Sequence, residues 1–71
     1  RMTEGRNAVE QALFNYPIKE VRNQYGTLVL ILNGGYEVEI SPTTDDLDES
    51  ILGLNIELFK NERTKKGGYD I

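Results

Sequence analysis

The chain has 71 residues, of which 38% are hydrophobic, 12 are acidic and 8 are basic, for a net charge of −4. A chain of this length forms one small domain with a limited core. It contains no histidine, cysteine or tryptophan, which removes the commonest general base, the thiol nucleophile, disulfides and the preferred zinc ligands. We therefore expect a protein that is not an enzyme and that has no cofactor and no bound metal.

The hydropathy of the chain argues against a membrane location. The longest apolar run is residues 28–32, far shorter than the roughly 20 residues that a membrane-spanning helix needs. The first residues show no apolar stretch of the signal-peptide type. We expect a cytoplasmic protein that does not bind membranes.

The charges are distributed unevenly along the sequence. Residues 1–22 carry a net charge of +1, residues 23–59 carry −7 with no basic residue, and residues 60–71 carry +2. An acidic segment between mildly basic ends indicates either a solvated surface or a face that meets a basic partner.

The first predicted element is an amphipathic helix over residues 7–16. Its apolar stripe has members at positions i, i+3, i+4 and i+7, namely Val9, Ala12, Leu13 and Tyr16. Asn7 is the expected N-cap, with Thr3 as an earlier alternative, and Pro17 ends the helix.

Three strands of an antiparallel meander are predicted next, at residues 18–24, 27–32 and 36–40. The first alternates poorly, so we expect a weak edge strand. The second is apolar on both faces, as in a central strand covered on both sides. Because one helix covers only one face, the sequence predicts that a second helix or a second copy of the chain covers the other.

The turn at residues 33–35 determines how the second and third strands pair. A two-residue turn would place Leu30 opposite Glu37, whereas a three-residue loop with Gly35 in the left-handed conformation places Leu30 opposite Val38. We predict the three-residue loop because it separates the leucines from the glutamates.

The segment after residue 45 has two interpretations. The favoured one is a second helix from a capping box at Asp46 to about residue 63, and the alternative is a short helix that ends at Gly53 and a fourth strand from Leu54. The predicted fold is therefore a single α+β domain over residues 1–71, with an N-terminal helix, a three-stranded antiparallel β-meander and a C-terminal helix. Its ordered core spans about residues 5–63, and residues 64–71 form a basic tail.

The leading functional hypothesis is a small, acidic, homo-oligomeric binding module. It would inhibit or regulate a protein with a basic surface, as regulators carried by phages and plasmids do, and its acidity argues against duplex nucleic acid. The predicted partner-binding residues lie on the third strand and the loop after it: Tyr36, Glu37, Glu39, Asp45, Asp46, Asp48 and Glu49. The acidic loop lacks the ligand spacing of a calcium-binding EF-hand. Acidic residues at the start of a helix are explained by their favourable interaction with the helix dipole, so they do not indicate a metal site.

An alternative hypothesis is a protein that sequesters a nucleotide or another phosphorylated small molecule at a subunit interface. It depends on basic side chains and an aromatic ring near the end of the sequence: Arg63, Lys65, Lys66 and Tyr69. Positive charge and flexible glycine backbone suit the binding of a phosphate, and an aromatic ring suits stacking on a nucleobase.

Overall fold

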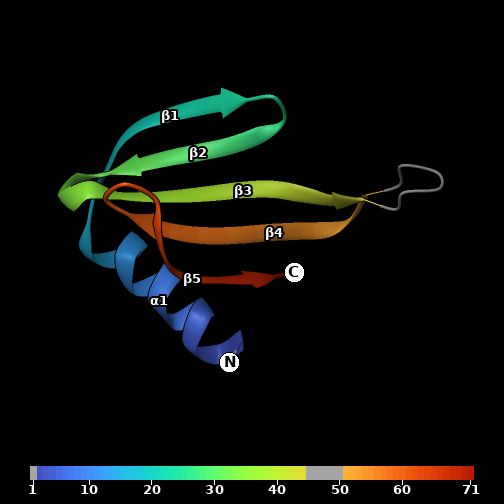
Figure 1. Cartoon of the computed structure of the whole chain (residues 1–71), viewed down its shortest axis with the longest axis horizontal. Helices are drawn as coiled ribbons and strands as arrows, with labels where there is room; N and C mark the ends of the chain where they lie inside the picture. The colour runs from blue at the N-terminus through green and yellow to red at the C-terminus, as the bar shows by residue number, and fades with distance from the viewer. Residues whose placement is uncertain (1, 45–50) are drawn as a thin grey trace.

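The computed structural model describes residues 2–44 and 51–71, which form one helix and one five-stranded sheet (Figure 1). The helix, α1, spans Met2–Asn15. All neighbouring strands are antiparallel and follow one another in chain order across the sheet. The strands are β1 (Ile18–Gln24), β2 (Thr27–Leu32), β3 (Tyr36–Thr44), β4 (Ile51–Lys60) and β5 (Thr64–Asp70).

The first half of the chain confirms the predicted helix, the three strands and their pairing. The helix begins at Met2, earlier than the expected cap at Asn7, and ends before Pro17. β1 is an edge strand, and a three-residue 3₁₀ turn (η1, Asn33–Gly35) joins β2 to β3. Gly34 and Gly35 both have φ of +81°, and Leu30 lies opposite Val38, as the three-residue loop requires.

The predicted C-terminal helix is wrong, because residues 51–60 form strand β4. The alternative placed a strand from Leu54, but the strand already begins at Ile51; the start of either predicted helix lies outside the described residues. The strand prevails because its period of two sends Ile56 and Leu58 to the face that α1 covers and Glu57 to the opposite face. β4 also bonds to a neighbour on each side, whereas a helix here would contain Gly53 in its interior.

Residues 64–71, expected as a basic tail, instead contribute strand β5. Two glycines, Gly67 of this segment and Gly5 of α1, allow the helix to approach the sheet closely. A Cβ on Gly67 would lie only 2.9 Å from the Cβ of Ala8, and a Cβ on Gly5 would overlap the Gly68 carbonyl oxygen. Gly67, part of a glycine pair that suggested a flexible tail, therefore lies in the seam between the helix and β5.

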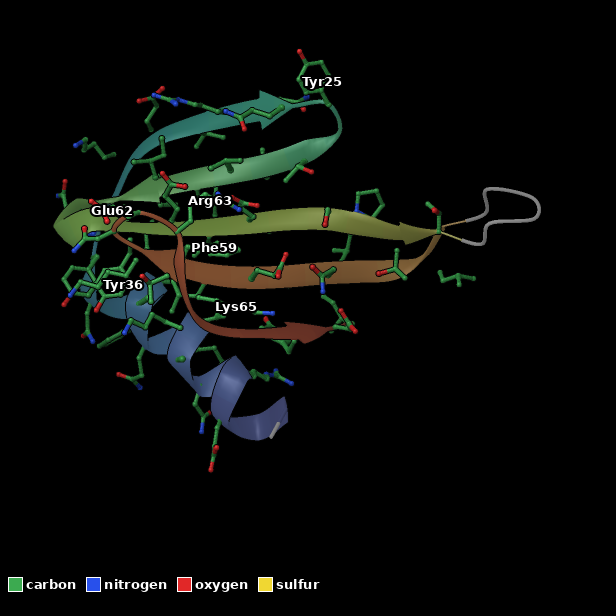
Figure 2. The ribbon with its side chains drawn as sticks, viewed as in Figure 1. Tyr25, Tyr36, Phe59, Glu62, Arg63 and Lys65 are labelled. Atoms are coloured by element: carbon green, nitrogen blue, oxygen red, sulfur yellow. The ribbon has the colours of Figure 1, made fainter. Side chains whose placement is uncertain are left out.

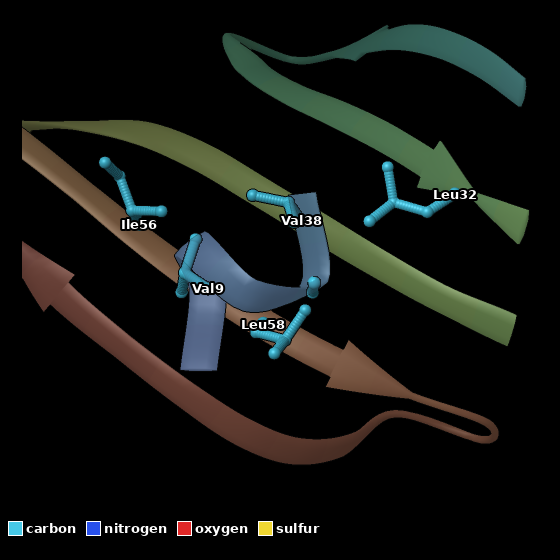
Figure 3. Close-up of a cluster of buried hydrophobic side chains, with 6 residues drawn as sticks. Val9, Leu32, Val38, Ile56 and Leu58 are labelled. Carbon is cyan, nitrogen blue, oxygen red and sulfur yellow. The ribbon is translucent and has the colours of Figure 1, made fainter. Parts of the chain in front are cut away.

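The hydrophobic core lies between α1 and one face of the sheet, which we call the helix-side face (Figure 3). Residues directly opposite one another in an antiparallel pair share a face, so the pairing of Leu30, Val38 and Leu58 places all three on the helix-side face. The buried cluster consists of Val9, Ala12, Leu32, Val38, Ile56 and Leu58.

The other side of the sheet, which we call the open face, carries no covering helix within residues 2–44 and 51–71. Val29 lies on this face and yet is only 4% exposed. Its direct neighbours across the strands are Arg22 and Glu39, and long charged side chains cover apolar surface with their aliphatic stems. Long charged side chains thus flank the second face, where the sequence predicted another helix or another copy.

Candidate functional site

The candidate site is a group of charged side chains around two apolar ones on the open face (Figure 2). The register places Glu37 of β3 between Ile31 of β2 and Phe59 of β4. The neighbouring row contains Glu39 and Glu57. Period-two alternation brings these side chains to one surface, because the intervening residues point into the core.

Basic side chains from β5 and from the turn before it pair with these carboxylates. Arg63 donates a hydrogen bond to Glu39 and lies 3.9 Å from a Glu37 carboxylate oxygen. The Lys65 ammonium lies 3.1 Å from Glu57. Both bases are more than half exposed, so water screens each ion pair and the pairs contribute little to stability. Their main consequence is to order the side chains of this face.

The turn between β4 and β5 positions Arg63. Asn61, Glu62 and Arg63 are three consecutive non-glycine residues with positive φ, at 33°, 50° and 64°, which is uncommon and energetically unfavourable. The backbone N–H of Asn61 donates a hydrogen bond to the Gly35 carbonyl oxygen of the η1 turn, with an N···O distance of 3.1 Å. This cross-brace holds the turn so that the Arg63 guanidinium lies 4.2 Å from the centre of the Phe59 ring.

A cleft of about 400 Å³ lies between the two turns. Gly35 and Glu37 line it on the side of β3, and Asn61, Glu62 and Arg63 line it on the side of the β4–β5 turn, with Phe59 between them. Arg63 is partnered by Glu39, whereas Glu62 has no ion-pair partner among residues 2–44 and 51–71. The cleft therefore combines an aromatic ring with an excess of negative charge.

Hydrogen bonding shifts the pKa values of the paired groups. The Glu39 carboxylate, which accepts a hydrogen bond from Arg63, raises the pKa of that guanidinium further above its ordinary value. The Arg22 guanidinium, 2.6 Å from Glu20, lowers the pKa of the Glu20 carboxyl by donating a hydrogen bond. The Glu20–Arg22 pair therefore contributes stability above the ordinary glutamate pKa and loses it as the pH falls through the lowered pKa of Glu20.

We expect Arg22→Gln to return the pKa of Glu20 toward its ordinary value, because the hydrogen bond is the largest cause of the shift. An NMR titration that follows the Glu20 side-chain carboxyl carbon measures this. Lys19→Gln is the matched control, since Lys19 lowers the pKa of Glu20 only through weaker Coulomb attraction. An equal rise in both variants would contradict the assignment.

The predicted partner-binding residues divide between the two faces. Glu37 and Glu39 lie side by side on the open face, as expected, but each is within ion-pair distance of Arg63. Tyr36 lies on the helix-side face, where its ring centre is 4.7 Å from that of Tyr16 and 4.8 Å from the Lys60 ammonium. Four predicted residues lie outside the described part of the chain: Asp45, Asp46, Asp48 and Glu49.

The residues predicted for a phosphorylated ligand do not converge. Arg63 and Lys65 share the open face, but carboxylates already pair with both. Lys66 is exposed at an irregularity of the β4–β5 register. Tyr69 lies opposite Ile56 on the helix-side face, with its ring centre 5.5 Å from the Arg6 guanidinium.

The sequence reasoning missed Phe59, Glu62 and the Asn61 brace. The sequence contained one indication of Phe59: it directly follows the apolar Leu58, and adjacent residues of a strand face opposite sides of a sheet, so one of the two must lie outside the core. That signal had meaning only once residues 51–60 were known to be a strand. The Asn61 brace joins turns that are distant in the sequence, so no local pattern indicates it.

No family model, curated protein or solved structure matches this chain. Within residues 2–44 and 51–71, acidic side chains form no group of three or more suited to a metal ion. The same residues include no helix with the length and hydropathy needed to cross a bilayer.

Proposed function

We propose that this chain is a non-catalytic binding module for a protein with a basic surface, and that the cleft on the open face receives a lysine or arginine side chain of that partner. The observation that carries the proposal is the cleft of about 400 Å³ that Glu37, Glu62 and Phe59 line. The two carboxylates of the cleft suit the charged end of a lysine or arginine, and the aromatic ring suits its aliphatic stem.

Charge supports a cationic occupant. Within the cleft, Arg63 is engaged by Glu39 and has Glu37 only 3.9 Å away. The Glu62 carboxylate is exposed and has no ion-pair partner in the described part of the chain. An added cation would meet uncompensated negative charge, whereas an added anion would meet two carboxylates before it reached a paired guanidinium.

The aromatic ring supports an occupant with a flat or apolar stem. Phe59 is half-buried, and Arg63 covers part of its ring at 4.2 Å. A partner guanidinium or ammonium near this ring would gain a cation–π interaction of the same kind. The Arg63 guanidinium shows that this ring packs against a cation, and an incoming side chain would use the part of the ring that Arg63 does not cover.

The biological consequence follows from steric occlusion. A module of this size that covers a basic patch would block whatever anionic ligand the patch binds, and so inhibit or regulate its partner. The phosphorylated-ligand alternative has less support, because Arg63 and Lys65 are already paired and Tyr69 lies on the other face.

The test titrates the isotope-labelled protein with two peptides, tetra-arginine and tetra-lysine with amidated C-termini. Binding is measured by the changes in the NMR chemical shifts of the protein's backbone amides. We expect shifts concentrated at residues 35–39 and 59–65, and binding that weakens as salt rises from about 20 to about 200 mM. Glu62→Gln should weaken binding by about 2–5-fold, the range for one exposed charge pair.

Glu10→Gln is the matched control, because it removes the same charge from the exposed surface of α1. Its affinity for the peptides should equal that of the unaltered protein. Equal weakening in both variants, or shifts spread over α1, would mean that the peptides respond only to net charge, and the proposal would be rejected.

A further inference from the structure

β1 is an edge strand whose outer side has no partner in the described part of the chain. Within residues 2–44 and 51–71 it pairs only with β2, and all seven of its residues are exposed. Figure 1 shows it at the border of the sheet opposite β5. An edge strand of this kind presents unpaired backbone N–H and C=O groups to which another strand can bond.

The β1–β2 hairpin determines which backbone groups of β1 point outward. Its two-residue turn, residues 25–26, has positive φ at both positions and begins directly after Gln24. Residues that flank such a turn hydrogen-bond to each other. Alternation along the strand then directs the N–H and C=O of Arg22 toward β2 and those of Val21 and Asn23 away from it. A strand added at this edge would therefore bond to Val21 and Asn23.

The charges of β1 are self-complementary about Val21. Glu20 and Arg22 flank it on the open face, where the Arg22 guanidinium donates a hydrogen bond of 2.6 Å to the Glu20 carboxylate. In an antiparallel pair of β1 strands centred on Val21, Glu20 lies directly opposite Arg22 of the second copy. Directly opposed Cβ atoms are about 4.5–5.5 Å apart, closer than the roughly 6.5–7 Å between next-but-one residues of one strand. Each guanidinium would therefore lie between two carboxylates.

Other two-fold registers of this strand bring like charges together. Opposed residues of an antiparallel pair share a face and a backbone orientation, so the pairing can shift only in steps of two residues. A pair centred on Glu20 opposes that residue to its own copy, and a pair centred on Arg22 does the same for the arginine. Like charges directly opposite each other are destabilising. The register centred on Val21 avoids this, and it also pairs all seven residues of β1.

We infer that β1 binds β1 of a second copy of this chain, antiparallel and centred on Val21, so that the two five-stranded sheets join edge to edge. The complementarity selects a second copy because one strand carries both halves of it, as a two-fold interface requires. The register irregularity between Ile18 and Glu20 shortens the regular part of the ladder, so we expect a weak dimer. Because the two-fold axis is perpendicular to the joined sheets, both open faces would lie on the same side.

Two charge-reversed variants test the pairing by sedimentation equilibrium over micromolar to millimolar concentrations. The unaltered chain should pass from 8.1 kDa to twice that mass. Glu20→Arg and Arg22→Glu should each weaken the dimer by at least about 10-fold, because like charges then oppose each other twice. An equal mixture of the two variants should restore a dimer, since each arginine again faces a glutamate. Their net charges of −2 and −6 have the same sign, so general attraction does not join them.

Lys19→Glu is the matched control for Arg22→Glu. It makes the same change of net charge on the same strand, but residue 19 lies opposite the uncharged Asn23 in the proposed register. Its dimer should stay within about 2-fold of that of the unaltered chain, because only the general charge repulsion changes. Equal weakening by Lys19→Glu and Arg22→Glu would mean that net charge governs association, and the inference would be rejected.

Amide hydrogen exchange gives a readout that needs no variant. The Val21 N–H should become protected as the protein concentration rises, whereas the Arg22 N–H, which bonds to β2, should be protected at every concentration. A chain that stays monomeric, a dimer that leaves the Val21 N–H unprotected, or folded variants that do not associate when mixed would each overturn the inference. These substitutions leave the residues of the cleft unchanged, so the peptide-binding test fails or succeeds separately.

Discussion

Leu58→Ala should lower the free energy of unfolding by about 2–5 kcal/mol. Leu58 is 2% exposed and belongs to the core cluster with Val38 and Val9, so truncation leaves a cavity in addition to the lost transfer free energy. A domain of this length has a total stability of about 4–10 kcal/mol. The urea concentration at the unfolding midpoint should therefore fall markedly, as urea denaturation followed by circular dichroism would show.

Leu52→Ala provides the matched control within the same strand. Leu52 is 67% exposed, so the same chemical change there should alter the free energy of unfolding by less than about 1 kcal/mol. If residues 51–60 formed the helix that the sequence favoured, Leu54 and Leu58 would share its apolar side, and burial would not alternate as it does along β4. Equal destabilisation by the two variants would contradict the burial of Leu58 in the core beneath α1.

Local patterns predicted the first half of the fold because each decision there depended on neighbouring residues. The stripe of α1, the turn between β1 and β2 and the η1 loop are all local, and the separation of leucines from glutamates was sufficient to select the register. Beyond residue 45 the same leucines satisfied both a helical and a strand period. Only the pairing of β4 with both β3 and β5 distinguishes them, and such pairing is not local.

The site was predicted in part for the same reason. Alternation placed Glu37 and Glu39 on one face, and this is where they lie. The base that meets them, Arg63, comes from beyond Phe59, where the sequence predicted the end of a helix. An acidic stretch and a basic stretch were therefore interpreted as separate surfaces, although the β4–β5 turn folds Arg63 back onto the acidic pair.

Gly5→Ala tests the seam between α1 and β5, and the sign of its effect is diagnostic. Helix propensity alone predicts stabilisation by up to about 1 kcal/mol, because alanine is a better helix former than glycine. The structure predicts the opposite, since a Cβ on Gly5 would overlap the Gly68 carbonyl oxygen of β5. That contact involves backbone on both sides, so α1 must move away from the sheet instead of a side chain rotating.

We therefore expect Gly5→Ala to destabilise the protein by about 1–3 kcal/mol, the usual range for overpacking. Asn7→Ala is the control, because Asn7 is exposed on the same helix and the change should stabilise by up to about 0.7 kcal/mol through propensity alone. Urea denaturation of both variants gives the two signs. Amide exchange should also quicken in β5, because the displaced helix no longer protects that strand. Stabilisation by both substitutions would show that α1 does not rest on Gly68, and the packing of the helix against β5 would then have to be revised.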